Sequence, residues 1–174
     1  MKSVLKIILL LILPAFSNAQ DSNLDRLKLE LKNATNDTLR MAYFTEFYGY
    51  YYQRKIDSAL YYNEHGLFLS QKLKLKIWEA WLLGTKGNIL MMMGNYPGSY
   101  QSVIQGLNIA QDPENEKGFW RWRFMPVKTT ARINRLEALA YLHQQLGNLY
   151  NLTGDTAKRI LENLEQKKNW RRIK

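Results

Sequence analysis

A short segment that alternates aromatic and basic residues is the part of this sequence best suited to binding chemistry. It reads Phe119-Trp120-Arg121-Trp122-Arg123-Phe124. Arginine pairs with phosphates and aromatic rings stack, so an exposed patch of this kind could hold an anionic lipid, a glycan or a nucleic acid. The alternative is a loop folded back over the domain, with buried rings and arginine stems along the surface. We favour the folded-back loop and keep Trp120, Arg121, Trp122 and Arg123 as a candidate patch.

Two histidines are the other residues with catalytic or metal-binding potential. His65 and His143 are far apart in the sequence, and His143 falls in a repeat position where a ring packs between helices. The sequence contains no nucleophile-elbow, zinc-protease or phosphate-loop motif. We interpret both histidines as packing residues and expect no catalytic residue, no cofactor, no metal and no enzyme activity.

The first residues predict export. Lys2 and Lys6 precede an apolar run over residues 7–13, and Ser17-Asn18-Ala19 offers small residues for cleavage. The run is too short to cross about 30 Å of hydrocarbon as a helix. We therefore predict a signal peptide over residues 1–19, cut near Ala19-Gln20, and a location in the periplasm or outside the cell.

The charge is strongly positive and uneven. The formal net charge is +10, and Lys158–Lys174 holds seven Lys or Arg against two Glu. Nucleic acid is a poor partner for an exported chain, whereas a weak attraction to anionic membranes stays open. The sequence has no cysteine, which excludes disulfides and thiol catalysis.

A repeated pattern indicates the fold. The stretch HQQLGNLY (143–150) fits the tetratricopeptide pattern W-x2-L-G-x2-Y, with histidine in the tryptophan position. Sixty residues earlier, GNILMMMGN (87–95) has the layout of GNLYNLTGD (147–155). DSALYYNEHGLFLSQ (57–71) aligns in the same way with PGSYQSVIQGLNIAQ (97–111), forty residues later. Such recurrence predicts stacked helical pairs.

The offsets predict an all-α, right-handed solenoid of about three helix pairs, each with a helix A and a helix B. The units span residues 37–72, 75–111 and 131–157, after a leading helix and turn at 20–36. An insertion at 112–130 separates the second unit from the third. Gly66 and Gly106 recur in helix B, which indicates a close crossing, since an interior glycine costs about 1 kcal/mol against alanine.

The last residues break the pattern. Arg159 stands where the earlier units have a small residue, and basic residues follow it. We therefore expect residues 158–174 to form a basic tail that ends a shortened array.

Residues 37–157 resemble tetratricopeptide-repeat (TPR) proteins. LNIAQDPENEKGFW (107–120) and RLEALAYLHQQLGNLYNLTGDTAK (135–158) are similar, more narrowly, to the exported TPR sensor regions of Bacteroidetes-type two-component histidine kinases. In those proteins a membrane helix and a cytoplasmic kinase follow the repeats. The resemblance implies a signalling role, whereas the kinase motifs themselves do not occur in this sequence.

The resemblance also implies that helix A of each unit lines a concave groove. By the offsets, one face of the three A helices carries aromatic, amide and methionine side chains that suit an extended peptide or a sugar. These candidate groove residues are Phe44, Tyr48, Tyr52, Trp81, Asn88, Met92, Tyr141, Gln144 and Asn148.

We expect a non-catalytic module that binds a protein or peptide partner in this groove, as a sensor or scaffold in bacterial signal transduction. Two alternatives stay open: a soluble periplasmic binder of small ligands such as glycans, and a basic peripheral membrane protein.

Overall fold

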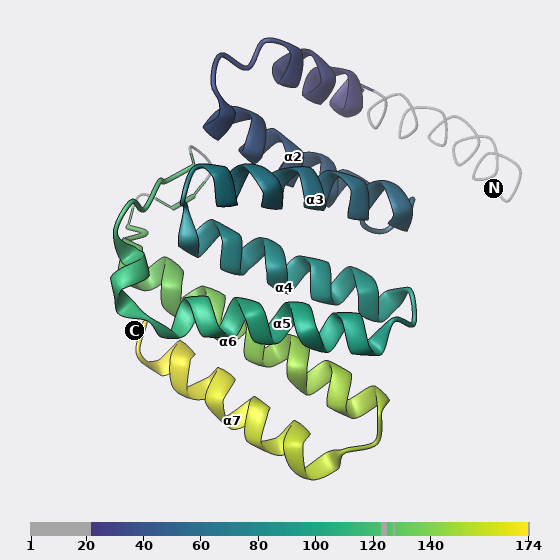
Figure 1. The fold of residues 1–174 in the computed structure, drawn as a ribbon, viewed down its shortest axis with the longest axis vertical. Helices are drawn as coiled ribbons and strands as arrows, with labels where there is room; N and C mark the ends of the chain where they lie inside the picture. Colours follow the sequence, from purple (N-terminus) through teal and green to yellow (C-terminus); the bar gives the residue numbers. More distant parts are fainter. Residues whose placement is uncertain (1–21, 123–124, 127, 174) are drawn as a thin grey trace, which may run out of the picture.

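The structure, a computed structural model, describes residues 22–122, 125–126 and 128–173. This part of the chain is helical and contains no strand, and its helices stack one upon the next (Figure 1). A leading helix covers residues 22–32. It is followed by α2 (Asp37–Tyr51), α3 (Ile56–Lys72), α4 (Lys76–Met92), α5 (Tyr96–Gln111), a 3-10 turn η1 (Pro113–Glu116), α6 (Ala131–Leu152) and α7 (Thr156–Arg171). The all-α, solenoid-like architecture is confirmed.

Local sequence explains where the helices begin and end. The side chains of Asn36, Asn95, Thr130 and Asp155 each accept a hydrogen bond from a backbone N–H in the first turn of the helix that follows. Such caps stabilise a helix by about 1 kcal/mol. Gly94 and Gly154 adopt φ values of 78° and 81°, the left-handed conformation expected where helix A ends. The helix pairs α2–α3, α4–α5 and α6–α7 span residues 37–72, 76–111 and 131–171.

The core lies between the helices of the second unit and helix A of the third. Ile77 and Ala80 of α4, Val103 of α5 and Leu136 and Leu142 of α6 are buried in one cluster. The close crossing expected at Gly106 is present, because an added Cβ would lie 2.7 Å from the Leu142 side chain and 3.1 Å from the Ala80 carbonyl oxygen. Gly66 is less crowded, with its nearest neighbour at 3.4 Å.

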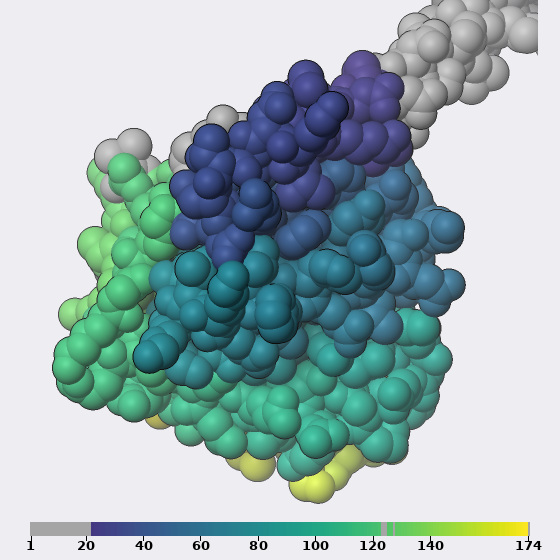
Figure 2. Space-filling model, turned by 45° about the horizontal axis from the view of Figure 1, so that its top comes forward, coloured from purple at the N-terminus to yellow at the C-terminus, as the bar shows by residue number. Residues whose placement is uncertain are grey.

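The insertion folds back over the A helices of the first two units. Trp122 is 6% exposed and packs in a cluster with Tyr43 of α2 and Trp78 of α4, and Trp120 and Met125 pack at its edge. Figure 2 shows the green insertion along one side of the molecule, where it reaches the purple and blue N-terminal helices. This is the arrangement of the folded-back loop.

The end of the described chain differs from the expected basic tail. Helix α7 continues to Arg171 and packs on α6, so residues 158–171 form helix B of the third unit. Arg159 is accommodated at the helix surface, where its guanidinium donates to Asn151 Oδ1 at 2.8 Å. None of the described helices is both long and apolar enough to span a bilayer. The predicted signal peptide and its cleavage site lie outside the described residues.

Candidate functional site

The A helices α2, α4 and α6 form one shared surface, which we call the helix-A face. Several of the predicted groove residues meet there. The Asn88 amide donates to the Tyr52 hydroxyl at 2.7 Å, and the rings of Tyr48 and Tyr52 lie 5.5 Å apart. The Trp81 ring stacks on Tyr141 with centroids 5.1 Å apart. The three A helices thus contribute to one aromatic surface.

Two tyrosines of this surface are shielded from water. Burial, with a smaller contribution from Tyr52, raises the pKa of the Tyr48 hydroxyl well above its ordinary value. Burial also raises the pKa of Tyr141, with smaller contributions from Tyr48 and Tyr52. Both hydroxyls are therefore protonated and uncharged at neutral pH.

Beside this cluster the helix-A face is hollowed into a pocket of about 240 Å³, which we call the insertion pocket. Three A helices and the insertion supply its walls, and most of its lining is apolar. The lining residues are Thr45, Trp78, Trp81, Leu82, Thr85, Met125, Pro126, Thr129, Asn134 and Glu137. Clefts where several elements converge on a few polar groups are the usual places for ligand binding.

The two indole rings of the insertion pocket are held in place by neighbours. Trp78 Nε1 donates to the Trp120 carbonyl oxygen at 3.0 Å, so the insertion fixes this ring. Trp81 is fixed by its stack on Tyr141. That stack needs a glycine opposite it, because a Cβ added at Gly84 would lie 2.8 Å from the Tyr141 ring. A rigid aromatic wall loses little conformational entropy when a ligand binds.

Helix α6 contributes an amide and a carboxyl side chain to the lining of the insertion pocket, Asn134 and Glu137. Asn134 is 3% exposed, and its Oδ1 has no hydrogen-bond partner in the structure. Glu137 lies one turn further along the same face, and burial raises the pKa of its carboxyl above the ordinary value. An unpaired buried acceptor of this kind costs about 1–3 kcal/mol of folding free energy.

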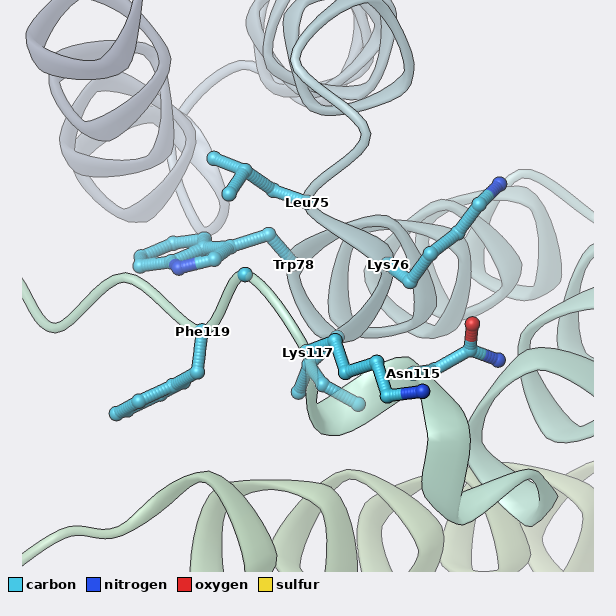
Figure 3. A pocket seen from close by; sticks show the side chains of 8 residues that line it. Leu75, Lys76, Trp78, Asn115, Lys117 and Phe119 are labelled. Carbon is cyan, nitrogen blue, oxygen red and sulfur yellow. The ribbon is translucent and has the colours of Figure 1, made fainter.

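The insertion makes a second contact with the start of α4. In Figure 3 the Trp78 side chain points toward the insertion beside Phe119, whereas Lys76 extends away from it. Lys76 Nζ pairs with Glu79 at 2.7 Å. The hollow between these residues has essentially no room for a water molecule, so it is a packing contact.

Among the predicted groove residues, Trp81 lines the insertion pocket, four others form the adjoining tyrosine cluster, and the rest lie elsewhere. Phe44 packs against His65 and Tyr62 of α3, inside the first unit. Met92, Gln144 and Asn148 are exposed and do not line the pocket. Their role in binding remains a prediction.

The candidate patch is divided by the fold. Trp122 is buried and Trp120 is half-buried, whereas Arg121 is exposed. Arg123 lies outside the described residues. Trp122 Nε1 donates to Glu46 at 3.3 Å, and its ring meets Tyr43 edge-on with centroids 5.6 Å apart. The two tryptophans therefore pack against the A helices and hold Trp78, which lines the pocket.

The two histidines occupy separate units. His65 Nδ1 lies 2.8 Å from the Tyr61 carbonyl oxygen, and its ring packs on Phe44. His143 Nδ1 lies 2.6 Å from Glu162 and joins α6 to α7. No cluster of metal-ligating side chains occurs among the described residues. His65 therefore packs within the first unit, whereas His143 makes a polar contact with a carboxylate between α6 and α7.

The sequence matches a known family over residues 14–118, which cover the first two units and the start of the insertion. The family is described as the SusR N-terminal TPR domain. The chain belongs to this family. TPR domains are in general non-catalytic modules that bind other proteins, and the stacked pairs and shared helix-A face are those of such a module. No curated protein matches the sequence.

Of the residues that line the insertion pocket, Trp81 is the one that the sequence analysis predicted as a groove residue. Trp78, Thr85, Asn134 and Glu137 were not among the predicted residues, and neither was Met125. Trp78, Asn134 and Glu137 could have been found by extending the predicted stripes toward the helix starts. Trp78 precedes Trp81 by three residues, and Glu137 precedes Tyr141 by four, which keeps them on one face.

Proposed function

We propose that this TPR module is exported and holds an extended segment of a partner protein on its helix-A face, as the sensing or scaffolding part of a bacterial signalling system. The observation that carries the proposal is the insertion pocket, where three A helices and the folded-back insertion surround one hollow. A surface shared by several repeats is the usual binding surface of a solenoid.

The size of the pocket favours a protein segment. Its volume of about 240 Å³ is below the ~300–1,000 Å³ typical of small-molecule sites. It therefore suits one anchoring side chain of a longer ligand. The tyrosine cluster of Tyr48, Tyr52, Asn88 and Tyr141 continues the same surface and offers neutral hydrogen-bonding groups to the rest of the segment.

The signalling role is supported by two observations on the sequence and not by the geometry of the pocket. The sequence resembles exported sensor regions, and the matching family is described as an N-terminal domain, which is followed by another part in proteins so described. Export rests on the charge and hydropathy pattern of residues 1–19.

Peptide selection tests the binding proposal. The full chain is used to select ligands from a random dodecapeptide library, and a photo-reactive residue is placed either at Thr129, on the rim of the pocket, or at Gln101, exposed on α5. We expect selected peptides to crosslink from position 129 and not from position 101. Failure to select any peptide, or crosslinking from position 101 alone, would overturn the proposal.

Export is tested separately with a fusion of residues 1–25 to alkaline phosphatase, which is active only outside the cytoplasm. We expect an active fusion in bacterial cells, and loss of activity when Lys2, Lys6 and the apolar run are removed. An inactive fusion would contradict export.

A further inference from the structure

One side of α7 combines apolar and basic side chains and is exposed along its whole length. It carries Ile160, Leu164, Lys167 and Arg171, which recur at intervals of three or four residues and so share one face of the helix. All four residues are exposed, and the two apolar ones are more than half exposed. Figure 1 shows α7 at the end of the stack, and among the described helices only α6 packs on it. We call this side the α7 face.

Comparison with α5 shows that the α7 face is poorly suited to receive another helix. The two helices correspond residue by residue, sixty positions apart, because each begins directly after its capping residue. In α5, Leu107 and Ala110 are buried in the core cluster that joins this helix to α6. Their counterparts in α7 are Lys167 and Trp170, both exposed. A helix packed there as α6 packs on α5 would bury an ammonium group and be held away by an indole ring.

The charge of the α7 face is positive, because the carboxylates of this helix are already paired. Glu162 lies 2.6 Å from His143 on α6, and Glu165 pairs with Lys168 on α7 itself. Within the described part of the chain, Lys167 and Arg171 form no ion pair. A second copy of the chain would bring like charges together on this face, so an anionic surface is the complementary occupant.

We propose that the α7 face lies on the surface of an anionic lipid bilayer. Ile160 and Leu164 enter the boundary between headgroups and acyl chains, as the apolar side of an interfacial helix does. Lys167 and Arg171 extend their charged ends to the lipid phosphates, and Trp170 is of the residue type enriched at membrane interfaces. The residues that line the insertion pocket come from other elements, so this contact attaches the module to a membrane without occupying the pocket.

The test reads lipid contact at a single position of the full chain. Because the sequence has no cysteine, an environment-sensitive fluorophore can be attached at Leu161→Cys beside the α7 face, or at Phe68→Cys on α3. The two native residues are 61% and 64% exposed, which makes them matched sites. Emission is measured with vesicles of phosphatidylcholine alone and of equal parts phosphatidylcholine and phosphatidylglycerol. We expect a blue shift from position 161 on the anionic vesicles only, and none from position 68.

A pair of charge variants tests which cations are responsible. Lys167→Gln combined with Arg171→Gln should weaken the apparent affinity for anionic vesicles by about tenfold or more, since each basic residue near the surface contributes to binding. Lys72→Gln combined with Lys117→Gln removes the same charge from exposed sites elsewhere and should change the affinity by less than about threefold. Salt at about 0.5 M should abolish the shift from position 161. Circular dichroism confirms that each variant is folded.

Three results would each overturn the membrane contact. The first is a label at position 161 that does not respond to anionic vesicles, or responds equally to neutral ones. The second is an equal loss of affinity in the two double variants, which would mean that net charge alone attracts the protein. The third is a shift that appears on concentrating the protein without vesicles, which would mean that a second copy covers the α7 face. Peptide binding at the helix-A face is measured independently and stands or falls by its own test.

Discussion

Two segments of similar composition differ in how deeply the fold buries their tryptophan side chains. Trp120-Arg121-Trp122 in the insertion and Trp170-Arg171-Arg172 at the end of α7 both combine indoles with arginine. Trp122 is 6% exposed and belongs to a core cluster, whereas Trp170 is 46% exposed. What decides burial here is therefore the surface against which a segment can pack, because the residue types are nearly the same.

The two surroundings explain the difference. The insertion lies against the helix-A face, where its tryptophan rings pack on Tyr43 and Trp78. Among the described helices, α7 packs on α6 alone, and it leaves Ile160, Leu161 and Leu164 more than half exposed. The insertion thus completes a buried aromatic cluster beside a pocket, whereas one face of α7 keeps its apolar side chains exposed to solvent.

The largest expected contrast is between the two tryptophans. Trp122→Ala should destabilise the fold by about 3–5 kcal/mol, the usual loss for a buried tryptophan. Trp170→Ala should cost less than about 1 kcal/mol, since the side chain stays largely in water. Urea unfolding followed by circular dichroism measures both. Equal losses would show that the insertion does not belong to the core.

The second contrast uses glycines at equivalent positions. A Cβ at Gly87 would lie 2.4 Å from Val103, a stiff and fully buried residue, and 3.2 Å from the Ser99 carbonyl oxygen. We expect Gly87→Ala to cost about 1–3 kcal/mol. At Gly147 the nearest atom is the tip of exposed Asn163, which can rotate away, so Gly147→Ala should stay within about 1 kcal/mol of the wild type. Thermal melts of both variants measure the two losses of stability. A larger loss for Gly147→Ala than for Gly87→Ala would contradict this prediction.

A smaller effect is expected on the uncovered face of α7. Leu164 is 56% exposed, so Leu164→Gln should change the free energy of unfolding by no more than about 0.5 kcal/mol. The matched change Leu142→Gln, at a residue with 0% exposure, should prevent stable folding or cost several-fold more. A large loss at Leu164 would mean that this face is covered in solution.

The smallest expected effect concerns Glu137. Because burial raises the pKa of this carboxyl in the folded state, its contribution favours folding at low pH and is lost as the pH rises through the raised pKa. Glu137→Gln should therefore remove a shallow decline in stability on the alkaline side of pH 4.5, the ordinary carboxyl value. Unfolding curves from pH 4 to pH 8 test the sign; a steeper decline in the variant would contradict it.

The fold could be predicted from the sequence because comparing one repeat with the next shows which positions are equivalent. Matched positions such as Gly87 and Gly147 fixed the register of the helices, and capping residues such as Asn95 and Asp155 fixed their starts. The end of the array was harder to predict. Composition suggested a basic tail after residue 158, but α6 offers enough surface to hold α7 as a helix.

The site was readable only in part. The stripe of Tyr48, Tyr52, Asn88 and Tyr141 followed from helical spacing, and the structure brings these side chains together. The wall formed by Met125 and Thr129 could not be predicted, because spacing along a non-repeating insertion does not show where it returns. Pocket shape depends on that return path and not on any local pattern.

The most direct test of the account compares one indole in the insertion pocket with one on α7. The affinity of a selected peptide is measured for Trp81→Ala and Trp170→Ala, after both variants are shown to be folded. We predict a loss of more than about tenfold for Trp81→Ala, which removes an aromatic anchor, and an unchanged affinity for Trp170→Ala. Unchanged affinity for Trp81→Ala, or a loss confined to Trp170→Ala, would contradict binding at the helix-A face.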